Sequence, residues 1–211
     1  MGSPSDRAVP DRNSYRAQVR HETRERFLDA AQRVFEDIGY SAASVQDILQ
    51  ASGGGRATFY THFASKADVA GCLFERLLPA SRRRYQQLAD TPVLTHRIMR
   101  EWLEEGMAFF VRNRSIVNAV NCAIAEDGDV AERHYTWITE AVACLSGAPG
   151  PGYFQEAQLR ATALVMQWER FCTHWIVRGV RVTEDVGLVL DVFADIWCRE
   201  LDVISKGLAA T

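Results

Sequence analysis

The sequence predicts an all-α protein of about nine helices, in which a three-helix helix-turn-helix unit precedes a larger helical bundle. Apolar residues recur at helical spacing almost throughout the 211 residues, and no alternating pattern long enough for a β-strand occurs. A glycine-rich break at 52–55 separates two short helical segments near the start of the chain. We expect a flexible N-terminal arm at 1–19, the helix-turn-helix domain at 20–66 and a second domain at 67–211.

The arm carries Ser, Pro, Asp and Arg without periodicity, and a helical pattern begins at about Val19. The apolar face of this first helix consists of Phe27, Ala30, Ala31, Val34, Phe35 and Ile38. Gly39 stands where a helix commonly ends. Ser44 and Asp47 have the spacing of a capping box, which predicts a second, short helix. After the glycines, Arg56–Phe63 is expected to form the third.

A fourth helix is expected from Lys66 to about Asp90, capped by Ser65, with Pro79 bending or interrupting it. Further helices are expected at Thr95–Val111, Ile116–Ala125, Val130–Leu145, Glu156–Arg178 and Thr183–Leu208. The run SGAPGPG at 146–152 predicts a loop.

The residue types that metal sites and active sites require are scattered. The five cysteines form no CxxC pair or Cys/His cluster, and none of the five histidines pairs with another at i+4. The acidic run at 126–129 lacks the spacing of a calcium loop. We therefore expect no catalytic residue, no metal and no cofactor. An enzyme built on a helical bundle is an alternative for which the sequence offers no site.

No apolar run approaches the ~18 residues that a membrane span requires. Met1–Pro10 is polar and lacks the apolar core of a signal peptide. We expect a cytoplasmic protein that does not associate with membranes.

The charges are unevenly distributed. Residues 1–66 hold nine Lys or Arg against eight Asp or Glu, whereas the remainder holds 15 against 19. A weakly acidic body behind a slightly basic N-terminal unit fits a protein that presents one face to DNA. In such a unit Ser44 would lie at a helix N-terminus near phosphate, and Gly53 would allow the tight turn. The side chains able to reach phosphate oxygens are Thr58, Tyr60, Thr61, His62 and Lys66.

The run SGGGRATFYTHFASKADV, Ser52–Val69, resembles the signature of the TetR family of bacterial repressors. The resemblance implies a homodimer that binds a palindromic, double-stranded operator. It implies phosphate contacts from Tyr60, His62 and Lys66, with Phe59 and Phe63 packed inside. It also implies that the residues facing the major groove are Arg56, Ala57 and Thr58. Arg56 is the candidate for reading guanine.

Two glycines depart from the family pattern. The family usually has an apolar residue where Gly54 stands and Ser or Thr where Gly55 stands. Gly55 still serves as a helix cap, though less well than Ser. Gly54 is expected to lose a packing contact and to leave the recognition helix loosely held.

The last two helices are apolar on more than one face. This surplus predicts a homodimer through these helices, with burial inside one monomer as the alternative. The body also resembles the ethionamide-resistance repressor subgroup of the family, in which aromatic residues line an apolar tunnel. That resemblance implies a binding site for an apolar small-molecule effector lined by Trp102, Phe109, Trp137, Val165, Trp168 and Trp197. An ordinary packed core, and hence a constitutive DNA-binding regulator without an effector, is the alternative.

Overall fold

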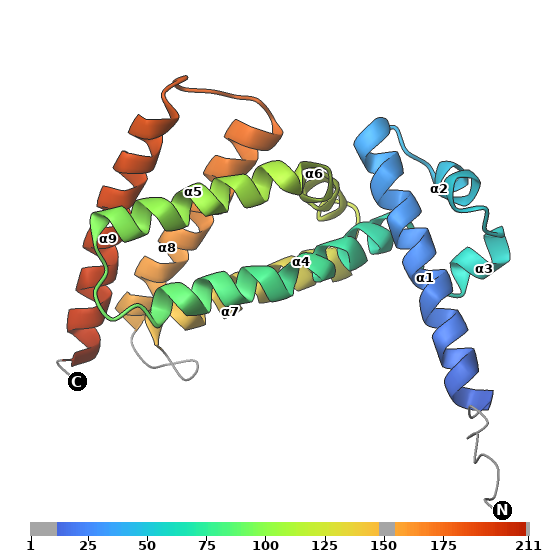
Figure 1. Cartoon of the computed structure of the whole chain (residues 1–211), viewed down its shortest axis with the longest axis horizontal. Coiled ribbons are helices and arrows are strands. Elements are labelled where there is room, and N and C mark those ends of the chain that lie inside the picture. The colour runs from blue at the N-terminus through green and yellow to red at the C-terminus, as the bar shows by residue number, and fades with distance from the viewer. Residues whose placement is uncertain (1–11, 148–154, 210–211) are drawn as a thin grey trace, which may run out of the picture.

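The computed structural model describes residues 12–147 and 155–209, and most of these residues are helical (Figure 1). They contain nine α-helices and one π-helical turn, with no strand among them. The predicted all-α fold is confirmed. Residues 1–11 of the predicted arm and most of the predicted loop at 146–152 lie outside the described residues.

The N-terminal unit consists of α1 (Arg12–Asp37), α2 (Val45–Ser52) and α3 (Arg56–Tyr60). The expectation that the arm extends to residue 19 is wrong, because α1 already begins at Arg12. Residues 14–22 of α1 are exposed, so this part of the helix carries no apolar period that the sequence could reveal. Helix α3 ends at Tyr60 rather than Phe63, and the hydroxyl of Thr61 donates to the Thr58 carbonyl at this end.

Helix α4 (Lys66–Ala89) leads from this unit into the body (Figure 1). Pro79 lies within α4 and does not interrupt it. The remaining elements are α5 (His96–Arg112), α6 (Arg114–Ala123), α7 (Gly128–Ser146), α8 (Gln155–Cys172), the π-helical turn η1 (Thr173–Val177) and α9 (Val186–Ala209). Helix α4 packs against α6 and α7, and α5 packs against α9. None of the helices in the described ranges has the length and apolar character of a membrane span.

Three phenylalanines form the core of the N-terminal unit. The rings of Phe27 and Phe59 meet edge to face at 5.5 Å, and those of Phe27 and Phe63 at 6.3 Å. The expected loss of packing at Gly54 is wrong, because Phe27 fills that space. A Cβ atom on Gly54 would lie 2.4 Å from the Phe27 ring. The glycine therefore allows α1 to approach the turn.

The predicted caps of α2 are present. The Ser44 hydroxyl accepts from the backbone N–H of Asp47, and the Asp47 carboxylate accepts from the backbone N–H of Ser44. Gly53 has a φ of 65°, in the left-handed region that glycine adopts without strain, and it ends α2. The sharp reversal between α2 and α3 therefore depends on this residue.

Candidate nucleic-acid interface and ligand cavity

Helix α3 buries Phe59 and presents its other side chains to solvent. Arg56, Ala57, Thr58 and Tyr60 are exposed, as are Ser44 and Thr61 at neighbouring helix ends. The Arg56 guanidinium lies over the Tyr60 ring, 5.6 Å from its centre. The structure thus brings six of the eight residues predicted to bind DNA to the surface around α2 and α3.

His62 is half-buried beside two arginines of α1. Partial burial and the charges of Arg20 and Arg24 lower the pKa of His62. Arg24 also lies over the Phe63 ring, 5.3 Å from its centre. Arg24 was not predicted from the sequence, although Arg20 and Arg24 are four residues apart and therefore share a helix face. These two arginines extend the positive charge of the candidate interface onto α1.

The side chain of Lys66 is half-buried at the start of α4. Its Nζ atom donates to the carbonyl oxygens of Tyr40 at 2.8 Å and Ala43 at 2.9 Å, and lies 4.0 Å from the centre of the Tyr40 ring. The Tyr40 hydroxyl in turn donates to Glu126, which precedes α7, at 2.7 Å. Lys66 therefore joins the start of α4 to the segment between α1 and α2, and its ammonium is already occupied by protein groups.

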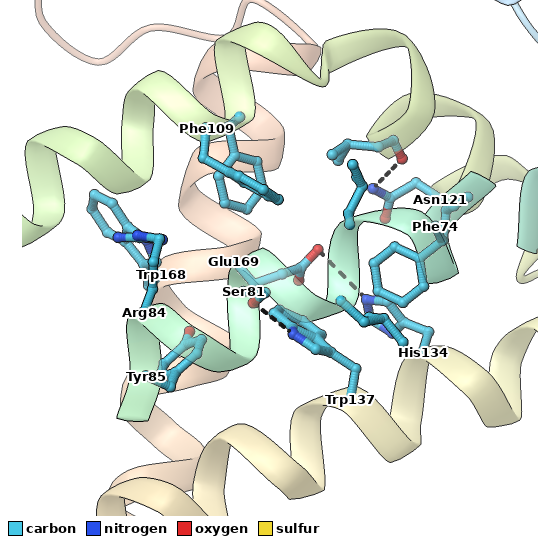
Figure 2. Close-up of a pocket in the computed structure, with 15 residues that line it drawn as sticks. Phe74, Ser81, Arg84, Tyr85, Phe109, Asn121, His134, Trp137, Trp168 and Glu169 are labelled. Atoms are coloured by element: carbon cyan, nitrogen blue, oxygen red, sulfur yellow. Dashed lines mark hydrogen bonds and ion pairs between the residues drawn. The ribbon is translucent and has the colours of Figure 1, made fainter. Parts of the chain in front are cut away.

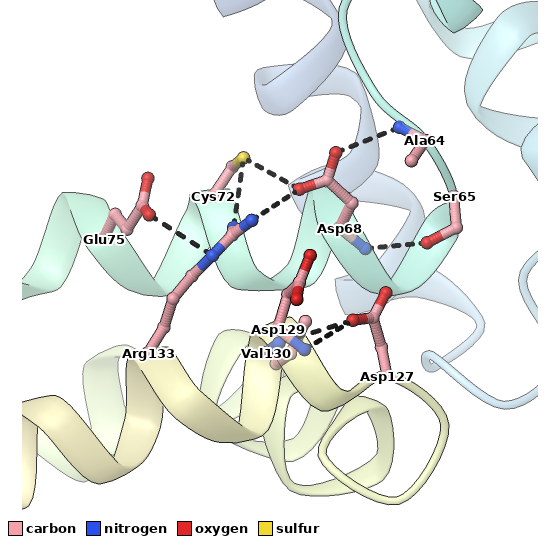
Figure 3. A network of polar contacts seen from close by, with 9 residues as sticks. All are labelled: Ala64, Ser65, Asp68, Cys72, Glu75, Asp127, Asp129, Val130 and Arg133. Carbon is pink, nitrogen blue, oxygen red and sulfur yellow. Dashed lines mark hydrogen bonds and ion pairs between the residues drawn. The ribbon is translucent and has the colours of Figure 1, made fainter.

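A polar network joins α4 to α7 near the N-terminal unit (Figure 3). Arg133 Nη2 lies 3.1 Å from Asp68 Oδ1, and Arg133 Nε lies 3.6 Å from Glu75 Oε1. The other oxygen of Asp68 accepts from the backbone N–H of Ala64, in the turn between α3 and α4. A movement of α7 against α4 would therefore act on the turn that follows α3.

The body contains a cavity of about 40 Å³ between α4, α5, α6, α7 and α8 (Figure 2). Its apolar lining includes Phe74, Leu77, Phe109, Phe110, Val117 and Trp137. A space of this size holds only a few water molecules. A larger ligand would have to displace the lining side chains or separate the helices.

The cavity contains three of the six predicted effector-binding residues, namely Phe109, Trp137 and Trp168. Trp102, Val165 and Trp197 do not line it, so the prediction of a single tunnel lined by all six does not match this arrangement. The Trp102 and Trp197 rings pack against each other at 5.2 Å, and Val165 is fully buried on α8. These three residues belong to the packed core.

The cavity also has polar lining residues that the sequence did not predict. These are Ser81, Arg84, Tyr85, Asn121, His134 and Glu169. One helix face of α4 could have revealed two of them, because the spacing i, i+4, i+7, i+11 places Ser81 and Tyr85 on the same face as Phe74 and Leu78.

His134 and Glu169 approach each other across this cavity. Their side chains lie 3.9 Å apart. Burial lowers the pKa of His134, although the nearby Glu169 opposes the shift. In the described parts of the chain, no three His, Cys, Asp or Glu side chains gather as a metal site.

The sequence model of the family described as bacterial regulatory proteins, tetR family, matches residues 27–71. The HTH-type transcriptional regulator EthR of Mycobacterium tuberculosis is 27% identical over 183 residues, which cover 82% of this chain and 84% of that protein. Both matches include α2, the glycine turn and α3. The matched proteins are transcriptional regulators, so the alternative of a helical-bundle enzyme is set aside.

Solved structures agree on the fold. The fatty acid degradation regulator FadR from Bacillus halodurans superposes with a TM-score of 0.61 at 15% identity, covering 85% of this chain and 94% of that one. FadR from Bacillus subtilis, solved in complex with stearoyl-CoA, has a TM-score of 0.56 at 13% identity, covering 85% and 96%. At these identities the likeness shows that the fold is shared.

Proposed function

Since this chain belongs to the TetR family of bacterial transcriptional regulators, we propose that it is a repressor released from a palindromic operator by a mainly apolar small molecule. Residues 20–66 would form the DNA-binding domain, and residues 67–211 the ligand-binding and dimerisation domain. The position of α4 carries this proposal. Its first residue, Lys66, holds the segment before α2, while Phe74, Ser81 and Tyr85 along it line the cavity.

The exposed face of α3 supports the proposed DNA contacts. Arg56, Ala57 and Thr58 would enter the major groove, with Arg56 reading guanine. The phosphate contacts would come from Tyr60, Thr61, His62 and the N-terminal end of α2 at Ser44. For Lys66 we propose a positioning role, because its ammonium already has two carbonyl partners.

Exposed apolar side chains on the last two helices support the proposed homodimer. On α8 and α9 these are Leu159, Met166, Val186, Leu188, Val192 and Val203. Surfaces of this kind usually mark protein interfaces. A two-fold dimer through α8 and α9 would present two α3 helices to successive major grooves, which requires a spacing of ~34–36 Å.

Release would follow from a change in that spacing. A ligand larger than the cavity must separate α4 from α5 or α7, and any shift of α4 is passed to the N-terminal unit. The ligand must bind the displaced state more tightly than the DNA-competent state, since equal affinity shifts nothing. A tenfold to hundredfold release requires only ~1.4–2.8 kcal/mol of such coupling.

The test begins with operator sequences selected from random DNA by the purified protein. Fluorescence anisotropy then measures operator affinity while straight-chain alcohols and indole are added as apolar probes. Loss of affinity with any probe supports an effector-responsive repressor. An affinity that no probe changes indicates the constitutive regulator instead.

A variant gives a second test that needs no ligand. Leu77→Trp enlarges a half-buried side chain of the cavity and should weaken operator binding as a ligand would. Leu94→Trp, at a half-buried leucine outside this cavity, is the matched control and should leave it unchanged. Equal affinities of the two variants would contradict the assignment of the cavity.

A further inference from the structure

Arg84 of α4 brings a positive charge to one end of the cavity. Its Nη2 atom donates to the carbonyl oxygen of Trp102 at 2.7 Å, and its guanidinium carbon lies 4.5 Å from the centre of a Trp102 ring. Its Nε atom is buried without a hydrogen-bond partner. Among residues 12–147 and 155–209, no carboxylate forms an ion pair with it. Its direct contacts are a carbonyl dipole and a ring face, and Glu105 acts on the charge without forming an ion pair with it.

Trp168 of α8 supplies a second unpartnered donor. Its side chain is 2% exposed, and its Nε1 atom has no acceptor. A Cβ atom on Gly106 of α5 would lie 2.8 Å from Arg84 Nη2 and 3.2 Å from Trp168 Nε1. Both side chains therefore gather where α5 has no side chain of its own. Figure 2 shows them together at one end of the cavity.

Several other polar groups of the cavity have partners within the protein. Trp137 Nε1 donates to the Ser81 hydroxyl at 2.9 Å, and the Asn121 amide donates to the carbonyl of Val117 at 2.9 Å. Glu169 accepts from the Thr173 hydroxyl at 3.1 Å and faces His134. A second acid in the cavity would be repelled by Glu169, so an anionic group has its favourable place at the Arg84 end.

We propose that the effector is an amphipathic carboxylic acid. Its carboxylate would accept from Arg84 Nε and Trp168 Nε1, and its apolar body would lie among Phe74, Phe109 and Val117. This inference rests on the effector site proposed above and adds the chemical class of the ligand. Leaving two buried N–H donors without acceptors is costly, and a carboxylate would satisfy both with charge-assisted hydrogen bonds.

Matched pairs of acids and alcohols test the charge separately from the apolar body. Straight-chain carboxylates and the 1-alcohols of the same lengths, including octanoate and 1-octanol, are titrated into the full-length protein by isothermal calorimetry. Because hydrogen bonds to a charged group contribute more than neutral ones, the acid should bind about tenfold tighter than its alcohol.

Two variants assign this preference to its residues. Arg84→Met keeps the apolar stem and removes the charge. Trp168→Phe replaces the indole by a single ring and so removes the Nε1 donor. Arg84→Met should abolish the preference for the acid, and Trp168→Phe should reduce it. Arg83→Met, at an exposed neighbour on α4, should keep it. Binding of the alcohol to each variant shows that the cavity is still formed.

The outcomes separate the two proposals. If the alcohols bind as tightly as the acids, or if Arg84→Met retains the preference, the inference is overturned while the proposed apolar effector site stands. If no acid and no alcohol of any length binds the parent protein, both are overturned. A preference for acids that depends on Arg84 and Trp168 supports the inference.

Discussion

Arg133 of α7 forms an ion pair with Asp68 of α4, with 3.1 Å between Nη2 and Oδ1, where α4 leaves the N-terminal unit. Helix α7 lines the cavity through His134 and Trp137, and Asp68 also holds the turn after α3 through Ala64. This pair therefore connects the cavity wall with the turn that follows α3.

Arg133→Met should uncouple ligand from DNA. The variant should bind effector and operator nearly as the parent does, while the release of operator by effector falls about tenfold, equivalent to ~1.4 kcal/mol of coupling. Arg82→Met is the matched control, because Arg82 pairs with Glu140 across the same two helices at 2.7 Å. Anisotropy titrations with and without effector measure both. Equal loss of coupling in the two variants would contradict a special role for Arg133.

Lys66→Met should destabilise the protein and leave the salt dependence of DNA binding unchanged. The variant leaves the carbonyls of Tyr40 and Ala43 without their charged donor, which costs about 1–3 kcal/mol of the free energy of unfolding. Urea unfolding measures this loss. If instead stability is kept and the salt slope falls by about one unit, Lys66 contacts a phosphate after all.

Operator affinity should rise as the pH falls from about 7.5 to about 5.5. Burial and the two nearby arginines lower the pKa of His62 in the free protein. A phosphate beside the imidazole favours its charged form and raises this pKa in the complex. The complex then binds more protons than the free protein, so lowering the pH favours the complex. His62→Gln should remove most of the dependence, and His134→Gln, in the cavity wall, should preserve it.

Gly54→Ala should lower the free energy of unfolding by about 1–3 kcal/mol, because the new methyl group overlaps the Phe27 ring. Adding Phe27→Leu should recover part of this loss, and a double-mutant cycle in urea measures the coupling. Gly55→Ser is the control. A Cβ atom at this position would lie 3.8 Å from Thr58 Oγ1, an ordinary contact, and a serine there can cap α3. Additive effects of the Gly54 and Phe27 changes would show that the two residues do not compete for space.

Single charges on the last two helices should dissociate the dimer. Met166→Glu on α8 and Leu188→Glu on α9 place a carboxylate on side chains that are 51% and 53% exposed in the monomer. Analytical ultracentrifugation at micromolar concentration should show a dimer for the parent and monomers for these variants. Val93→Glu, at a 70% exposed position before α5, should remain dimeric. A parent protein that sediments as a monomer would contradict the proposed interface.

The local signals of the N-terminal unit were sufficient to predict it. The capping box at Ser44, the positive φ of Gly53 and the buried ring of Phe59 all follow from residue type and short spacing. The exposed start of α1 was missed because a helix turn without an apolar face has no periodicity to detect.

The cavity could be predicted only in part. Its lining comes from five helices, and which aromatic residue faces the space depends on how those helices cross and rotate. Trp102 and Trp197 were predicted to line the cavity because they are large aromatic residues, but their rings pack against each other in the core. Arg84 lies in a run of three arginines that resembles a solvated surface, and only the packing of α4 turns it inward.

The small volume of the cavity has a consequence for the rate of the response. Since only about 40 Å³ is open, a ligand can enter only after the helices that line the cavity have separated. Motions of packed helices take microseconds to milliseconds or longer. At high effector concentration the observed rate of association should therefore level off at the frequency of opening. Beyond that point, the speed of derepression is a property of the helices around Phe109 and Trp137, and additional effector no longer accelerates it.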